Sequence, residues 1–162
     1  MNQQVLEAKQ SVVKEIVEKA KKSQSITIAE FRGLSVAQIQ QLRRSLQEVG
    51  AELSVYKNSL VARAVKELGY QGLDSMLVGP NALVFSKELS NGPKVLKKYS
   101  RRFGDVFTIK GGVAEGSTLG KAGIIEVADL PGREGVISMF LSCLQAPIRQ
   151  FACTVQAVAD AK

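Results

Sequence analysis

Apolar residues recur every three or four positions between residues 36 and 49, which predicts an amphipathic helix. The members of this stripe are Val36, Ile39, Leu42, Leu46 and Val49. Ser35 and Gln38 stand at the spacing of a capping box, in which each side chain accepts a hydrogen bond from the other residue's backbone N–H. Gly50 follows the stripe, where a residue in the left-handed conformation is expected to end the helix.

Beyond Gly50 the hydrophobic period changes to two. Residues 53–56 alternate between apolar and polar side chains, which predicts a strand. Residues 58–68 then return to helical spacing, and Asn58 is the expected N-cap of this second helix.

Two junctions in this region place a cation beside free backbone N–H groups. They are Arg32-Gly33, which precedes the first of these helices, and Lys57-Asn58, which precedes the second. Helix N-termini and cations attract the same anion, so both junctions suit phosphate. Arg63, on the second helix, is a further candidate for the same surface.

The remaining patterns complete an alternation of strands and helices. An amphipathic helix is expected over residues 5–20, with strands at residues 25–31, 82–85 and 106–110 and a helix that starts at Gly92-Pro93. Without the first helix and the helix at residues 58–68, the order is β-α-β-β-α-β. This order predicts an α+β, ferredoxin-like (split βαβ) antiparallel sheet with helices on one face and the two other helices as additions.

Pro131-Gly132 predicts a hinge between a globular domain (residues 1–130) and a C-terminal helix (residues 131–162). Two apolar sets repeat eleven residues apart in this tail: Ile137, Phe140, Leu141 and Leu144, followed by Ile148, Phe151, Ala152 and Val155. Eleven residues make three helical turns, so both sets share one face. Pro147, between the sets, is expected to kink or interrupt the helix.

A single helix outside the domain has no core of its own against which to bury this face. Tandem docking of partner proteins in the helix-in-groove mode is therefore the favoured interpretation. Folding back on the globular domain is the alternative. A membrane-surface role fits less well, because the polar side of the helix is nearly neutral.

The net charge is +7, with 22 Lys and Arg against 15 Asp and Glu, which favours a polyanionic partner. Charge alone leaves a merely basic protein as an equal alternative, and the lysines of the first helix are either a solvated face or a nucleic-acid contact. We expect no secretory signal, no membrane span and a cytoplasmic location. Cys143 and Cys153 are expected to be small buried hydrophobic residues rather than a disulfide.

Residues 115–122 come close to a nucleotide-binding P-loop. That motif needs Gly at the place of Glu115 and Ser or Thr at the place of Ala122. A carboxylate would repel phosphates, and Ala122 cannot bind magnesium. We therefore expect a turn that leads to a short helix over residues 123–129, and no nucleotide site.

The composition argues against an enzyme. The chain has no His, so a Ser-His-Asp or Cys-His arrangement cannot exist. No Cys and His cluster suggests a zinc site, and no paired carboxylates suggest acid–base chemistry. We expect no catalytic activity, no metal and no cofactor.

Several motifs extend over essentially the whole chain. The first three are Arg32-Gly33-Leu34, Leu42-Arg43-Arg44-Ser45-Leu46 and Lys57-Asn58-Ser59-Leu60; the later ones are Gly79-Pro80-Asn81-Ala82, Ile109-Lys110-Gly111-Gly112 and Leu130-Pro131-Gly132-Arg133-Glu134. Together they resemble the family of the bacterial ribosomal stalk-base protein, large-subunit ribosomal protein L-ten. Two positions depart from the family pattern. Gly132 replaces a frequent Ser or Thr cap, which predicts a looser hinge, and Ala62 replaces a second Arg, so only Arg63 is carried over.

The resemblance implies a structural role in the large ribosomal subunit. The globular domain would bind large-subunit rRNA together with ribosomal protein L-eleven, through Arg32, Gly33, Lys57, Asn58 and Arg63. The two apolar sets of the tail would each hold one dimer of the acidic stalk protein L-seven/twelve, and the stalk would recruit translational GTPases. The alternative is a basic adaptor or scaffold with a helix-docking tail outside the ribosome.

Overall fold

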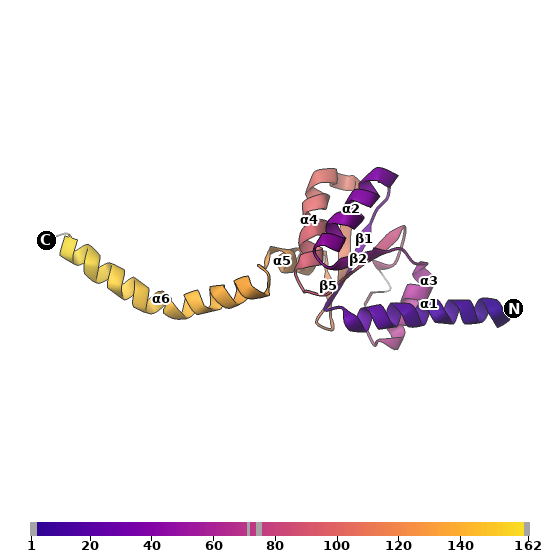
Figure 1. Cartoon of the computed structure of the whole chain (residues 1–162), viewed down its shortest axis with the longest axis horizontal. Coiled ribbons are helices and arrows are strands. Elements are labelled where there is room, and N and C mark those ends of the chain that lie inside the picture. The colour runs from indigo at the N-terminus through magenta and orange to yellow at the C-terminus, as the bar shows by residue number, and fades with distance from the viewer. Residues whose placement is uncertain (1–2, 71, 74–75, 161–162) are drawn as a thin grey trace. The chain divides into compact units, whose positions relative to one another are not determined.

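The computed structural model describes residues 3–70, 72–73 and 76–160 (Figure 1). It separates into two compact units, residues 1–130 and 131–162. The elements of the first unit are α1 (Gln3–Lys22), β1 (Ser25–Glu30), α2 (Val36–Glu48), β2 (Ala51–Ser54), α3 (Asn58–Glu67), β3 (Asn81–Ser86), α4 (Asn91–Phe103), η2 (Gly104–Val106), β4 (Thr108–Ala114), β5 (Ser117–Gly120) and α5 (Lys121–Asp129). The second unit is built on the single helix α6 (Arg133–Asp160).

The described strands form one antiparallel sheet in the order β2-β3-β1-β4-β5. β1 and β2 are joined through α2 and run parallel to each other, because each pairs antiparallel with β3, which lies between them. This is the split βαβ arrangement, so the predicted α+β fold is confirmed. β5 extends the sheet beyond β4.

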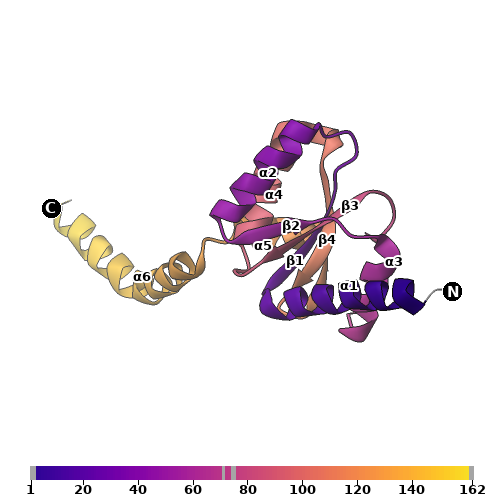
Figure 2. The same ribbon diagram turned by 45° about the vertical axis from the view of Figure 1, so that its right-hand side comes forward.

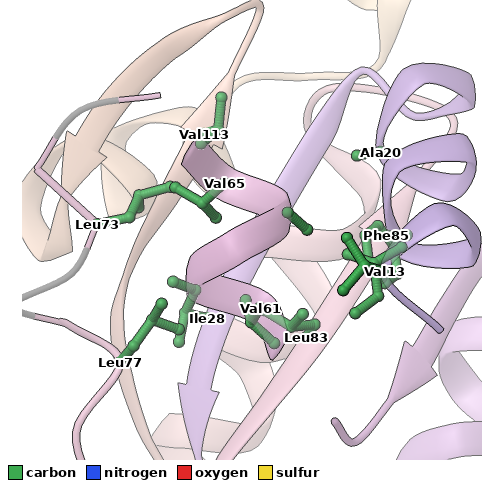
Figure 3. Packing of buried hydrophobic residues seen from close by; sticks show 12 residues of the cluster. Val13, Ala20, Ile28, Val61, Val65, Leu73, Leu77, Leu83, Phe85 and Val113 are labelled. Atoms are coloured by element: carbon green, nitrogen blue, oxygen red, sulfur yellow. The ribbon is translucent and has the colours of Figure 1, made fainter. Parts of the chain in front are cut away.

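Helices cover both faces of the sheet. The two helices of the split βαβ unit, α2 and α4, lie on one face as expected, and the two additional helices, α1 and α3, lie on the other. α2, α4 and α5 pack on one face around Leu42, Leu46, Leu96, Phe107 and Ile124. α1 and α3 pack on the other (Figure 2), where Val61 and Val65 of α3 lie against the sheet (Figure 3). The reason lies in the strands, since every residue of β3 is buried and its side chains alternate between two apolar cores.

The capping box of α2 is present as predicted. The Ser35 hydroxyl accepts a hydrogen bond from the Gln38 backbone N–H, and Gln38 Oε1 accepts one from the Ser35 N–H at 2.9 Å. Gly50 has a φ of 73° just past the helix end, as expected for a C′ glycine. Val36 is 73% exposed and was wrongly assigned to the apolar stripe that faces the core, because the first buried residue of α2 is Leu42.

Some predicted boundaries differ from the structure. β2 ends at Ser54, so Val55 lies outside the strand and is exposed. β4 begins at Thr108 and continues through Gly111-Gly112 to Ala114. The strand can continue because Gly112 has no side chain: a Cβ there would lie 2.1 Å from Ile26 O on β1.

The segment that resembles a P-loop is a β-hairpin. Only Glu115 and Gly116 form its turn, with φ values of 50° and 81°, and Ser117–Gly120 returns as β5 beside β4. The expected turn was therefore too long, while the expected short helix is present as α5.

Candidate functional sites

The two cationic junctions lie at the same end of the sheet. β1 and β2 run parallel, and their last residues face the first half of β3, with Glu30 opposite Asn81 and Ser54 opposite Leu83. Arg32 follows β1 and Lys57 follows β2, and both are exposed. The loop that enters β3, residues 77–80, lies at this end too. We call this end of the sheet, with Arg32, Gly33, Lys57 and Asn58, the sheet-end site.

Gly33 and Arg63 occupy different surroundings. Gly33 has a φ of 95°, which favours glycine, so this residue allows the turn before α2. The turn lies close to Val106 of η2. Arg63 is exposed on α3, on the side opposite the buried Val61, Ala64 and Val65. It lies more than one helical turn beyond Lys57, which places it beside the sheet-end site rather than within it.

Asn58 was wrongly expected to be the helix cap. Lys57 occupies the N-cap position with φ −67° and ψ 128° and makes no side-chain cap bond. Asn58 is the first helical residue, and its Nδ2 donates to Gly79 O at 2.9 Å while its Oδ1 accepts from Asn81 Nδ2 at 3.5 Å. Both ends of the carboxamide are thus engaged, so Asn58 holds the loop that enters β3.

Lys110 also holds the loop that enters β3. The sequence patterns did not predict this role. The Nζ of Lys110 lies 2.8 Å from Glu30 Oε2 and donates to Asn81 Oδ1 at 3.1 Å and to the Val78 carbonyl. These partners are about thirty residues or more away in the chain, and no periodicity signals such a contact. Only the antiparallel register brings them together.

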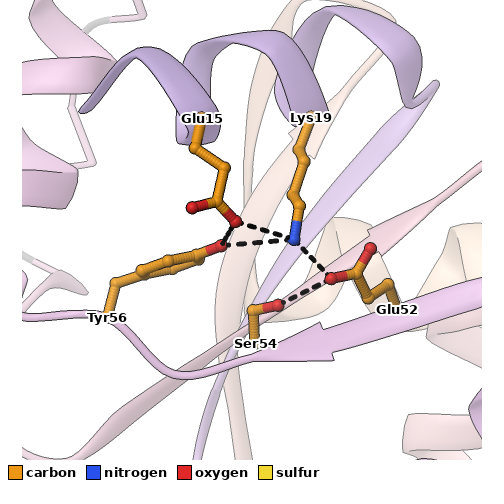
Figure 4. Close-up of polar contacts among 5 residues, drawn as sticks. All are labelled: Glu15, Lys19, Glu52, Ser54 and Tyr56. Carbon is orange, nitrogen blue, oxygen red and sulfur yellow. Dashed lines mark hydrogen bonds and ion pairs between the residues drawn. The ribbon is translucent and has the colours of Figure 1, made fainter. Parts of the chain in front are cut away.

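A second polar cluster ties α1 to β2 (Figure 4). Lys19 Nζ lies 3.0 Å from Glu15 Oε1 and also contacts Glu52, while the Tyr56 hydroxyl donates to Glu15 at 3.0 Å. The hydrogen bond from Lys19 lowers the pKa of both Glu15 and Glu52 below the ordinary value, and the bond to Glu52 raises the pKa of Lys19. Lys19 is thus paired with two carboxylates and is not a bare cation on the surface of α1.

α6 is a continuous helix of 28 residues that contains Pro147. The proline therefore does not interrupt the helix, which bends between its orange and yellow halves (Figure 1). No described residue of α6 is buried. The exposed side chains include all eight members of the two apolar sets, and Phe140 and Phe151 are 63% and 73% exposed.

One expectation about the tail was wrong. Cys143 and Cys153 are exposed free thiols, because α6 has no core within its own unit to bury them. By length and composition alone α6 could cross a membrane, with a mean hydropathy of 1.2 in its most apolar stretch. Charged residues are sparse along α6. Uncharged Gln and Ser stand between its apolar positions, so the sequence shows no long uninterrupted apolar run.

Among the described residues, no group of three or more His, Cys, Asp and Glu side chains is placed to hold a metal ion. The two surfaces that the sequence predicted as sites are a cationic sheet end and an apolar helix. Both are suited to macromolecular partners rather than to small molecules.

Comparison with known proteins identifies the family. A family profile described as "Ribosomal protein L10" matches residues 4–101, and a profile described as "Ribosomal protein uL10 C-terminal region" matches residues 130–162. Large ribosomal subunit protein uL10 of Shouchella clausii is 46% identical over 159 residues, which cover 98% of this chain and 95% of the relative. The uL10 proteins of Macrococcus caseolyticus and Bacillus licheniformis are 42% and 43% identical, over 99% and 97% of this chain and 93% and 95% of the relatives. The chain therefore belongs to the family of large ribosomal subunit protein uL10, as its motifs predicted.

Proposed function

We propose that the two units of this large-subunit ribosomal protein divide its work. The first unit binds large-subunit rRNA at the stalk base, beside ribosomal protein L-eleven. The second carries dimers of the acidic stalk protein L-seven/twelve, and the stalk in turn recruits translational GTPases in the bacterial cytoplasm. The protein acts as a scaffold, with no catalytic step and no cofactor of its own.

The exposed apolar stripe of α6 carries this proposal. Ile148 and Phe151 are 75% and 73% exposed, and the equivalent Ile137 and Phe140 are 51% and 63% exposed. A contiguous apolar surface of this kind is typical of an interaction site, and burial of such side chains supplies most of the binding free energy in helix-in-groove complexes. The eleven-residue repeat presents the same pattern twice on one face, which favours two dimers.

The sheet-end site supports binding of RNA. Arg32 and Lys57 are exposed beside the starts of α2 and α3, where backbone N–H groups and cations together favour phosphate oxygens. Gly33 allows the close turn at the first junction, Arg63 adds a cation next to the second, and Asn58 positions the loop between them. Membership of the uL10 family argues against the alternative of an adaptor outside the ribosome.

A truncation tests the division of labour. A chain that ends at Leu130 should fold, bind large-subunit rRNA and hold no stalk protein, whereas the full chain should hold two dimers. Sedimentation with reconstituted large subunits measures the first property, and native mass spectrometry of the complex with stalk protein counts the dimers. Retention of stalk protein by a folded residue 1–130 fragment would contradict the docking role of α6. Protection of the tail within an isolated full-length monomer would contradict it too, since the tail would then fold back on the first unit.

A further inference from the structure

Two helices hold nearly all of the protein's excess positive charge. α2 and α4 contain seven of the 22 Lys and Arg residues but only one of the 15 Asp and Glu residues, which is Glu48. These two helices therefore carry a net charge of +6, out of +7 for the whole chain. The sheet-end site does not account for this concentration, since its cations lie outside both helices.

The fold places α2 and α4 side by side on one face of the sheet (Figures 1 and 2). The hydroxyls of Ser45 on α2 and Tyr99 on α4 lie 3.0 Å apart. Asn91 Nδ2, at the start of α4, donates to Val49 O, at the end of α2, at 3.5 Å. The two helices are therefore neighbours that run in opposite directions, and together they present one outer surface.

Cations cover this outer surface. Leu96 and Tyr99 of α4 are buried against the sheet, so residues half a turn away point outward. On α2, Leu42 and Leu46 have the same role. The outward cations, all exposed, form a set that we call the α2–α4 basic face: Arg44, Lys94, Lys98, Arg101 and Arg102.

The cations of this face are available to a ligand. No ion pair involves any of the five among the described residues, whereas Lys97, on the flank of α4, pairs with Asp129 of α5. Arg102 lies 5.8 Å from the centre of the Phe103 ring, a contact that favours one orientation of its guanidinium group. Five unpaired like charges on adjacent helices repel one another, and a polyanion would relieve that repulsion.

The composition of the surface indicates which part of an RNA it would contact. The other outward residues of α2 include Gln40, Gln41 and Gln47, whose amides donate to phosphate and sugar oxygens. Recognition of unpaired bases needs aromatic or apolar platforms. The large exposed apolar residues on the described parts of these helices are limited to Val36, at the first position of α2.

We propose that the α2–α4 basic face is a second RNA-binding surface, which contacts the phosphate backbone of double-stranded RNA. The proposal rests on the proposed function, since it assumes that the first unit binds large-subunit rRNA. Arg101 and Arg102 stand at the end of α4 that leads into η2, and Val106 of η2 packs close to Gly33. The basic face thus begins beside the sheet-end site, and one RNA helix can run from one surface to the other.

Two triple variants of the full chain test this surface. In the first, Lys98, Arg101 and Arg102 are replaced by Gln. In the control, the exposed Lys14, Lys21 and Lys22 of α1 are replaced by Gln, which lowers the net charge by the same amount. The dissociation constant for transcribed large-subunit rRNA is measured over a series of salt concentrations, and circular dichroism with thermal melting verifies that both variants fold.

The α4 variant should bind at least about tenfold more weakly at moderate salt, with a salt slope lowered by about two to three units, because about 0.9 counterion is released per phosphate contact in a duplex. The control should keep the slope of the unmodified protein. If the two folded variants have equal salt slopes, the α2–α4 basic face does not bind RNA, although the protein can still bind rRNA elsewhere. An unmodified protein without salt-dependent rRNA binding would overturn the proposed function as well. An α4 variant that binds RNA normally but loses stalk protein would reassign the face to an acidic protein partner.

Discussion

The ammonium group of Lys110 lies 2.8 Å from the carboxylate of Glu30, and the two side chains are 23% and 24% exposed. The pair joins the end of β1 to β4 at the sheet-end site. Because Lys110 also donates to Asn81 and to the Val78 carbonyl, it connects two strands with the loop that enters β3. The sheet-end site is therefore built on a half-buried polar network rather than on exposed cations alone.

Replacement of Lys110 by Met should destabilise the protein by about 1–3 kcal/mol, because it leaves a half-buried carboxylate and a carbonyl without their charged donor. Urea denaturation measures the change. Lys98→Met is the matched control, since Lys98 is exposed on α4, and an exposed substitution is expected to change stability by less than about 0.5 kcal/mol. Equal effects of the two substitutions would show that the network contributes nothing to stability.

Replacement of Lys57 by Ala should weaken binding of large-subunit rRNA and lower the salt slope by about one unit, because one phosphate contact is lost. Filter binding over a range of salt concentrations measures both quantities. Lys66→Ala, at the other end of α3, should leave the slope unchanged. An unchanged affinity and slope for Lys57→Ala would remove this residue from the site.

Asn58→Ala should behave differently, because its carboxamide bonds to Gly79 and Asn81 rather than facing a ligand. We expect a loss of stability of about 1 kcal/mol from the missing hydrogen bonds and weaker RNA binding with an unchanged salt slope. Denaturation and salt titration of the same preparation separate the two effects. A lowered slope with unchanged stability would instead make Asn58 a direct phosphate contact.

The two apolar sets of α6 should act separately. Phe151→Asp puts a charge into one docking groove, which costs several kcal/mol if the charge is unpaired. It should remove one stalk dimer and leave the dimer on Ile137, Phe140, Leu141 and Leu144. Phe140→Asp should do the reverse, unless loading proceeds from one end, in which case one variant loses both dimers. Native mass spectrometry counts the dimers, and retention of both in each variant would refute docking on this stripe.

The cluster around Lys19 predicts a pH dependence of stability. The pKa values of Glu15 and Glu52 are lowered in the folded protein from the ordinary 4.5, so the unfolded chain binds protons first as the pH falls. The stability contributed by the cluster is therefore present above about pH 4.5 and lost progressively below it.

A comparison with Lys19→Met tests this dependence. At pH 6 the urea midpoint of the unmodified protein should exceed that of the variant, and the difference should shrink toward about pH 3. Both carboxylates are partly exposed, so added salt should reduce the difference as well. Lys14→Met, at an exposed position of α1, serves as the control. A difference that stays constant with pH would show that the ion pairs do not stabilise the fold.

The local sequence was sufficient for elements with strong periodic signals. The stripe of α2 with its capping box, the apolar side of α4 and the paired sets of α6 are set by side chains a few residues apart, so their geometry follows from helical spacing. The order of strands and helices then implied the split βαβ sheet, because connections are short and neighbouring elements pack together. The same short motifs indicated the family.

Contacts between distant residues needed the tertiary structure. The burial of both faces of β3 under two helical layers depends on how the helices pack on the sheet. The Lys110 network and the contact of Lys19 with Glu52 join residues about thirty or more positions apart. Amphipathic periodicity shows that a side chain is buried or exposed, but it does not identify the partner on the other side of the sheet.

The sequence by itself determined the identity of the helices, the apolar face of the tail and the net charge of +7. Only the tertiary structure decided where that charge lies: the antiparallel packing of α2 against α4 places cations separated by about fifty residues on one surface. Charge adds up along a sequence, but an electrostatic field depends on distances in space. The register of the strands and the packing of the helices set those distances.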